Sequence, residues 1–296
     1  MNGIFSDIKT TFRQRDNALH QLILINVIVF ATMIILSVVL QLTDNGQLFA
    51  SLRNYIALPS NPLTFLTRPW TIITYFFTHE GWLHIIFNML ILYWFGMLIR
   101  EYLGDRKLVS LYILGGLAGG LLYLLAYNLI PFFANRALVS NMIGASASVL
   151  AIVVAAATLL PDYSFRLLLI GSVKIKYIAA FLVLLSISGA VGGNAGGNIA
   201  HLGGALLGYV FIRQLQRGTD LGRPIHAVGE FAGRLFRRRS NLRVSYKNPR
   251  PKSAVSSPVG KPTQMEIDMI LDKISSSGYE SLSKEEKQKL FKASQN

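Results

Sequence analysis

Residues 143–160 read IGASASVLAIVVAAATLL, an apolar run that opens with small residues and carries a serine, Ser146, near its start. A run of about 18 apolar residues is long enough to cross the hydrocarbon core of a membrane as a helix. Small residues in such a helix usually serve close packing between backbones, so Ser146 alone is weak evidence for chemistry. The stretch therefore predicts a closely packed membrane helix with a hydroxyl at its N-terminal end.

Five more apolar runs lie at 19–40, 82–99, 108–127, 177–189 and 198–215, in a chain of 296 residues that is 52% hydrophobic and 15% charged. None shows the alternating pattern of a barrel strand, so we expect an all-α polytopic membrane protein with six transmembrane helices. The first run is longer than the apolar core of a signal peptide and lacks a cleavage site, which indicates a retained helix. The fifth run is ambiguous, because it could begin as early as Leu167 and would then enclose Lys174 and Lys176.

The chain has no cysteine, which excludes disulfides, thiolate metal sites and a cysteine nucleophile. We expect no metal and no cofactor. The net charge of +14 would suggest nucleic acid in a soluble protein, but here we attribute it to topology and contact with the membrane surface, and we expect no nucleic-acid partner.

The positive-inside rule predicts that both termini are cytoplasmic. We expect an integral multi-pass protein of the bacterial inner (plasma) membrane. The outer connections then hold three basic residues: Arg53, Arg68 and Arg136. The inner connections before the tail hold nine: Lys9, Arg13, Arg15, Arg100, Arg106, Lys107, Arg166, Lys174 and Lys176.

Four segments follow from this organisation: a cytoplasmic stretch at 1–18, a membrane domain at 19–215, a basic juxtamembrane segment and linker at 216–263, and a helical hairpin at 264–296. The basic segment is usually a solvated tail that fixes topology, but apolar residues between Ile225 and Phe236 also permit an amphipathic helix on anionic lipid. In the hairpin, Gly278 ends one helix, and Ser283 with Glu286 forms a capping box for the next.

Polar residues recur at one depth of the predicted membrane domain. His84 and Asn88 begin the second apolar run, Ser146 the fourth and His201 the sixth, and all three helices start at the outer face. Each residue has a common structural explanation, as an interfacial histidine, interhelical glue or a serine bonded to its own helix. Their coincidence at one depth favours a functional site, because ionisable groups inside membranes are usually functional.

A serine becomes a nucleophile when a base takes its proton, and His84 and His201 are the two candidate bases. His201 is preferred because it shares a helix face with Gly204 and Gly208, a GxxxG pattern that suits close approach to the Ser146 helix. His84 and Asn88 would donate hydrogen bonds to an oxyanion. The acidic residues lie in connections or at helix ends, so we expect a Ser-His dyad, with water entering past residues 189–197.

These motifs resemble the rhomboid family of intramembrane serine proteases. The resemblance rests on Trp70, Thr74, His79, His84, Asn88, Glu101, Gly104, Gly144, Ser146, Ala200, His201, Gly204 and Gly208, in that order and spacing. It implies the six-helix rhomboid core, with Ser146 as nucleophile, His201 as base and His84 with Asn88 as oxyanion donors. Gly144, Gly204, Gly208, His79, Trp70 and Glu101 would have supporting roles. The implied substrates are transmembrane helices of other proteins, cut near their outer ends.

Three positions depart from the commoner family pattern. Ala147 stands where many members have glycine, Leu150 where some have a tyrosine that stacks on the catalytic histidine, and Thr71 where some have arginine. A catalytically inactive rhomboid-like protein that binds transmembrane helices is the alternative, although it would not need to retain Ser146 and His201. A transporter would show inverted repeats, which the sequence lacks.

Overall fold

The computed structural model describes residues 10–11, 14, 17–136, 138–167, 171–236 and 262–294. The chain divides into two compact units, residues 1–237 and 238–296, which are described separately. Most of the predicted segment 1–18, the run Arg237–Arg239 and almost all of the Pro- and Ser-rich linker at 249–263 lie outside the described residues.

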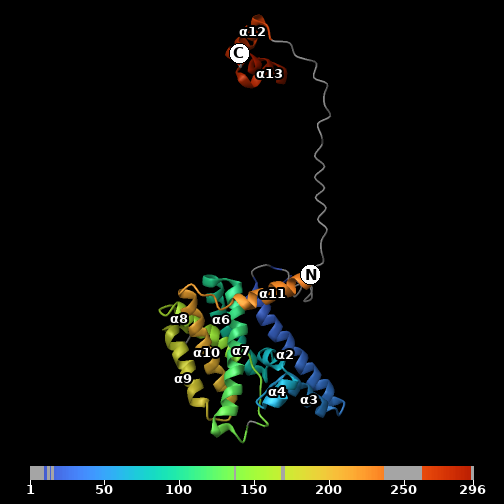
Figure 1. The fold of residues 1–296 in the computed structure, drawn as a ribbon, viewed down its shortest axis with the longest axis vertical. Helices are drawn as coiled ribbons and strands as arrows, with labels where there is room; N and C mark the ends of the chain where they lie inside the picture. Colours follow the sequence, from blue (N-terminus) through green and yellow to red (C-terminus); the bar gives the residue numbers. More distant parts are fainter. Residues whose placement is uncertain are drawn as a thin grey trace. The chain divides into compact units, whose positions relative to one another are not determined.

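The first unit is a bundle of apolar helices (Figure 1). Within the described residues, four helices are long and apolar enough to span a membrane: α2 (Ala18–Leu42), α6 (Trp82–Leu103), α7 (Asp105–Leu129) and α10 (Ala195–Gln216). Two further apolar helices, α8 (Ser146–Leu159) and α9 (Ile175–Gly189), have 14 and 15 residues. At 1.5 Å per residue α8 extends about 21 Å, less than the hydrocarbon core of about 30 Å.

The helix α8 forms the centre of this bundle, and ten of its 14 residues are buried. It packs against α6, α7, α9 and α10. On one side Ala147 and Ala151 lie against Gly119 and Gly115 of α7, and on the other their backbones lie against α10. Small residues on all three helices therefore allow the backbones to approach closely.

The connection between α2 and α6 is a series of short elements rather than one irregular loop. It contains α3 (Gly46–Ile56), α4 (Pro62–Thr67), α5 (Thr71–Thr74) and the 3₁₀ helix η1 (Tyr75–Phe77). Strand β1 (Leu58–Pro59) pairs antiparallel with β2 (Asn141–Met142), with Leu58 opposite Met142. This pairing ties the connection to the segment that enters α8.

Side chains hold this connection together without an arginine at position 71. Trp70 Nε1 donates to the Tyr55 carbonyl at 2.8 Å, and Thr74 Oγ1 donates to the Ile56 carbonyl at 2.7 Å. The Arg68 guanidinium lies 4.0 Å from the centroid of the Tyr55 ring. These contacts join α5 to the end of α3, so the loop is anchored despite Thr71.

A β-hairpin precedes α9, formed by β3 (Ser164–Leu167) and β4 (Gly171–Lys174). The earlier helix start considered from the sequence, at Leu167, is therefore wrong: the helix begins at Ile175, after the hairpin. Lys174 and Lys176 each lie 2.9 Å from Asp162, and their hydrogen bonds and charges lower the pKa of that carboxyl to about 2. Both lysines are thereby held at the end of the bundle rather than in the apolar run.

The remaining elements of this unit are η2 (Pro131–Phe133), after α7, and α11 (Arg223–Phe236), which packs against α7. Ion pairing of Lys107 with Asp220 fixes the turn before α11. Asp105 accepts a hydrogen bond from the Ala18 amide at 2.7 Å, which joins the starts of α7 and α2. Among the apolar residues of α11, Val228 is exposed.

The second unit contains α12 (Gln264–Ser277), η3 (Tyr279–Ser281) and α13 (Lys284–Ala293). Capping boxes open both long helices, with Thr263 and Glu266 at α12 and Ser283 and Glu286 at α13. Gly278, at φ +78°, ends α12. Across the hairpin, Lys273 pairs with Glu286 at 2.9 Å, and Lys289 pairs with Glu266 at 2.6 Å.

Candidate active site

Ser146 is the first residue of α8 and follows a turn that depends on glycine. Gly144 has a φ of +137°, which L side chains rarely adopt, and its amide donates to the Tyr75 carbonyl at 2.9 Å. No side chain caps α8, so backbone N–H groups of its first turn remain available beside Ser146. The serine hydroxyl therefore lies at the positive end of a helix, where negative charge is stabilised.

The Ser146 hydroxyl meets His201 across the interface of α8 and α10. His201 Nε2 lies 2.6 Å from Ser146 Oγ, a short hydrogen bond between residues 55 positions apart. The contact depends on glycine, because a Cβ at Gly204 would lie 2.8 Å from the Ala147 carbonyl carbon and one at Gly208 would lie 3.0 Å from that of Ala151. Neither position leaves room for a side chain.

Ala147, where many family members have glycine, carries a methyl group that packs against Gly119 of α7. Ala147 is 1% exposed, and a Cβ built on Gly119 would lie only 2.5 Å from the Ala147 Cβ. The absence of a side chain at Gly119 therefore accommodates the methyl. It points toward α7 and does not displace α10.

A second serine, Ser186 of α9, contacts the other ring nitrogen of His201. Ser186 Oγ lies 3.2 Å from His201 Nδ1 and donates to the Leu182 carbonyl at 2.9 Å. It is 3% exposed. The sequence reasoning missed this residue. The signal that could have found it is a hydroxyl in the apolar run of α9, about three helical turns from its charged end.

Asn88 and His84 approach the same site from α6. Asn88 is buried, its Nδ2 donates to the His84 carbonyl at 3.0 Å, and it lines one cavity with Ser146 and His201. A Cβ at Gly144 would lie 3.1 Å from His84 Nε2, so this ring lies against the turn that precedes Ser146. The amide of Asn88 keeps a second N–H that can point at a bound group.

The cavity around these side chains has a volume of about 140 Å³, enough to admit water. Beyond the residues already described, it is lined mainly by apolar side chains. The lining comprises Asn88, Ile91, Ser146, Val149, Leu150, Val153, Leu182, Leu185, Ser186, Asn198 and His201. Leu150 thus faces the site without an aromatic ring, and Asn198 adds an amide that sequence reasoning had not singled out.

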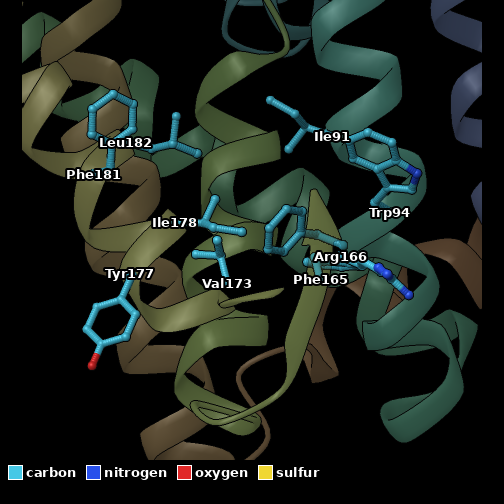
Figure 2. A pocket seen from close by; sticks show the side chains of 10 residues that line it. Ile91, Trp94, Phe165, Arg166, Val173, Tyr177, Ile178, Phe181 and Leu182 are labelled. Atoms are coloured by element: carbon cyan, nitrogen blue, oxygen red, sulfur yellow. The ribbon is translucent and has the colours of Figure 1, made fainter. Parts of the chain in front are cut away.

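A larger apolar groove of about 610 Å³ lies between α6 and α9 and shares Ile91 and Leu182 with the small cavity. Figure 2 shows Ile91 and Trp94 of α6 on one side and the side chains of α9 on the other, with Phe165 of the β-hairpin between them. Tyr177 and Phe181 of α9 are exposed. The groove between α6 and α9 is therefore adjacent to the small cavity that Ser146 and His201 line.

The other predicted residues lie outside the immediate site. Trp70 holds the connection between α2 and α6, as described above. Glu101 is exposed in the last turn of α6, about 20 Å along the helix from Asn88. His79 is 5% exposed, and its ring centroid lies 5.2 Å from that of His84. Burial, and then the proximity of His84, lower the pKa of His79 to about 4.

Over the described residues, no group of three or more histidine, cysteine, aspartate or glutamate side chains comes together in a way that could hold a metal ion.

The segment 189–197, past which we expected water to enter, includes the end of α9 and the start of α10. Residues 195–197 belong to α10, and Asn198 Nδ2 donates to the carbonyls of Gly189 and Asn194.

Comparison with known protein families gives two matches. The Rhomboid domain matches residues 66–217, about half of the chain, and a family of unknown function, DUF6576, matches residues 261–296. The first match contains Asn88, Ser146, Ser186 and His201. The second covers the two-helix unit, whose role the match leaves open.

Several curated proteins are similar over this region. The zebrafish (Danio rerio) presenilin-associated rhomboid-like protein A, mitochondrial, is 29% identical over 156 residues, which are 52% of this chain and 39% of that protein. RHOMBOID-like protein 12, mitochondrial, from Arabidopsis thaliana is 30% identical over 160 residues, 51% of this chain and 48% of that protein. The chain thus spans less than half the length of these relatives, and their organellar names give no support to the bacterial inner membrane expected from the sequence.

Proposed function

This chain belongs to the rhomboid family, and from that premise we propose that it is an intramembrane serine endopeptidase that cuts transmembrane helices near the outer face by a Ser-His dyad. The observation that carries the proposal is the 2.6 Å contact between Ser146 Oγ and His201 Nε2 inside a bundle of apolar helices. A serine in hydrogen-bond reach of a histidine is the arrangement that nucleophilic catalysis requires. The protein is an integral membrane protein with multiple apolar helices.

In the proposed reaction, His201 Nε2 accepts the Ser146 proton as Oγ attacks the carbonyl carbon of the scissile peptide bond. The resulting imidazolium returns that proton to the leaving nitrogen, and the peptide bond breaks to leave an ester on Ser146. Water then attacks the ester as His201 accepts its proton. The bond from the acyl carbon to Ser146 Oγ breaks, the imidazolium returns the proton to Oγ, and the carboxyl product leaves. The cavity beside the dyad has room for that water.

The negative charge on the carbonyl oxygen would be stabilised by donors that converge on Ser146. Asn88 offers its second amide hydrogen, His84 lies against the Gly144 turn, and the first-turn amides of α8 point in the same direction as the helix dipole. Removal of one such donor in other serine proteases costs about 3 to 4 kcal/mol of transition-state stabilisation.

The substrate class proposed is a single transmembrane helix, and the bilayer is its route of entry. The apolar groove between α6 and α9 supports this, because it presents aromatic and aliphatic side chains and shares Ile91 and Leu182 with the cavity at Ser146. A helix that lies in this groove must unwind locally to place an extended peptide bond at the serine, which favours segments with small residues.

The proposal includes the organisation of the whole chain. The shorter helices α8 and α9 would complete six membrane crossings in a domain at 19–215, with both termini on the side richer in basic residues. The segment at 216–263 would follow the membrane surface, and the exposed Val228 of α11 is consistent with contact to lipid. The hairpin at 264–296 would be an appended cytoplasmic element.

The test uses the full chain in detergent micelles and in liposomes, with a fluorophosphonate probe and a panel of single-span proteins that carry small residues near the outer end of the span. Wild type should be labelled and should cleave members of the panel, whereas Ser146→Ala should do neither. Ser148→Ala is the matched control, because Ser148 is two residues away on the same helix with its hydroxyl against Gly116 of α7.

Labelling or cleavage that persists in Ser146→Ala would refute the assignment of the nucleophile. If wild type neither reacts with the probe nor cleaves any panel member but still retains panel members in pull-down, the chain is instead an inactive rhomboid-like protein that binds transmembrane helices.

A further inference from the structure

The hydrogen bonds around His201 form a continuous series across three helices. Ser146 Oγ lies 2.6 Å from Nε2, Ser186 Oγ lies 3.2 Å from Nδ1, and the Ser186 hydroxyl donates to the Leu182 carbonyl at 2.9 Å. The series joins α8, α10 and α9. Both ring nitrogens of His201 are therefore engaged by serine oxygens.

A serine hydroxyl has one hydrogen, and the geometry pairs that of Ser186 with the Leu182 carbonyl. In this arrangement Ser186 Oγ accepts from His201, and Nδ1 carries the hydrogen. In a neutral imidazole the other nitrogen, Nε2, is then an acceptor, which is the state in which it can take the proton of Ser146.

No carboxylate performs this task in the cavity. None of the residues that line it is acidic, and Leu150 supplies no ring to stack on the histidine. Ser186 is 3% exposed, and its hydroxyl is fixed by the bond to the Leu182 carbonyl. A neutral hydroxyl that is itself fixed to the backbone of α9 is the polar group within reach of Nδ1.

On the basis of the proposed function, we propose that Ser186 is a positioning residue that holds His201 in its Nδ1–H tautomer and orients Nε2 toward Ser146. It takes the place that an aspartate occupies in the Ser-His-Asp arrangement, without the charge. Because it is neutral, it sets the tautomer and the ring orientation but adds no charge stabilisation to the imidazolium. Its location on α9, which also lines the apolar groove, makes the competence of the dyad depend on the position of that helix.

A matched pair of substitutions isolates the hydroxyl. Ser186→Thr keeps it and Ser186→Val removes it, while the two side chains have the same shape. A neutral hydrogen bond contributes about 0.5 to 1.5 kcal/mol, which corresponds to roughly a 2- to 13-fold effect. We expect Ser186→Val to have a kcat and a fluorophosphonate labelling rate about tenfold below those of Ser186→Thr, with KM unchanged.

A spectroscopic measurement reports the tautomer directly. Nitrogen chemical shifts of ¹⁵N-histidine-labelled protein, assigned by loss of the signal in His201→Gln, should show hydrogen on Nδ1 in wild type and Ser186→Thr and a mixture of tautomers in Ser186→Val. If the extra methyl prevents either variant from folding, Ser186→Ala takes its place, with the exposed Ser188→Ala on the same helix as control.

Equal kcat in the threonine and valine variants, or hydrogen on Nε2 in wild type, would overturn the role of Ser186. Failure of the proposed function has a different signature: wild type would be inert to substrate and probe. The nitrogen shifts would then still report whether Ser186 sets the tautomer of His201.

Discussion

Replacement of Gly204 by alanine should separate the two helices that carry Ser146 and His201. A Cβ at this position would lie 2.8 Å from the Ala147 carbonyl carbon, whereas carbon atoms in contact are normally about 3.5 to 4.0 Å apart. The neighbouring atoms are backbone, which has no rotamer that could move aside. The axes of α8 and α10 must therefore move apart by about 1 Å at this level.

That displacement acts on the dyad almost directly, because Gly204 is one helical turn from His201 and Ala147 adjoins Ser146. An added 1 Å would lengthen the contact between Oγ and Nε2 from 2.6 Å to about 3.6 Å, which is beyond hydrogen-bond distance. A misplacement of this size costs about 10²-fold in rate, or about 2.7 kcal/mol of activation free energy.

The assay is the rate of fluorophosphonate labelling of the full chain, accompanied by cleavage of a panel substrate and by thermal unfolding in detergent. Gly203→Ala is the matched control from the next position. Its Cβ would lie 2.7 Å from the Ala118 carbonyl oxygen and 3.0 Å from Gly119 Cα, both on α7. It should lower the free energy of unfolding by about 1 to 3 kcal/mol but keep labelling within about threefold of wild type.

Labelling of Gly204→Ala within threefold of wild type would refute the argument that this close approach sets the dyad geometry. An equal loss of labelling in Gly203→Ala would also refute it, since the effect would then follow general destabilisation of the bundle rather than separation of α8 from α10.

Three other predictions follow from single residues. Asn88→Ala should lower kcat by about 10²- to 10³-fold with little change in KM, because its free amide hydrogen is needed only when the oxyanion forms; steady-state cleavage measures both. The pKa of His79 is near 4 in the folded chain and about 6.5 in the unfolded chain. The unfolded chain therefore takes up this proton first, and the free energy of unfolding should fall by up to about 3 kcal/mol as the pH falls from 6.5 to 4. His79→Phe removes this component, so its thermal stability should change less with acid than that of wild type, and parallel curves would contradict the assignment. Ser283→Ala removes the hydroxyl that accepts from the Glu286 amide and should destabilise α13 by about 1 kcal/mol, seen as faster amide hydrogen exchange confined to that helix.

Hydropathy and charge along the chain were enough to predict a helical membrane protein, because both depend on local composition. The apolar runs at 19–40 and 198–215 correspond to α2 and α10 within a few residues. Motif spacing also pointed to the family to which the chain belongs. The less regular regions were harder to predict from the sequence. The elements at 46–77 are short, and the β-hairpin before α9 depends on pairing between strands rather than on periodicity.

The sequence by itself determined the kinds of residue available for chemistry: serine, histidine and asparagine at the starts of apolar helices, and glycines that permit close approach. The tertiary structure decided which of them meet. The 2.6 Å contact of Ser146 with His201, the space for the Ala147 methyl at Gly119 and the contact of Ser186 with His201 all join separate helices. The direction and depth at which helices cross depend on the packing of all their side chains together, so the partner of a single buried hydroxyl is decided only when the whole bundle has formed.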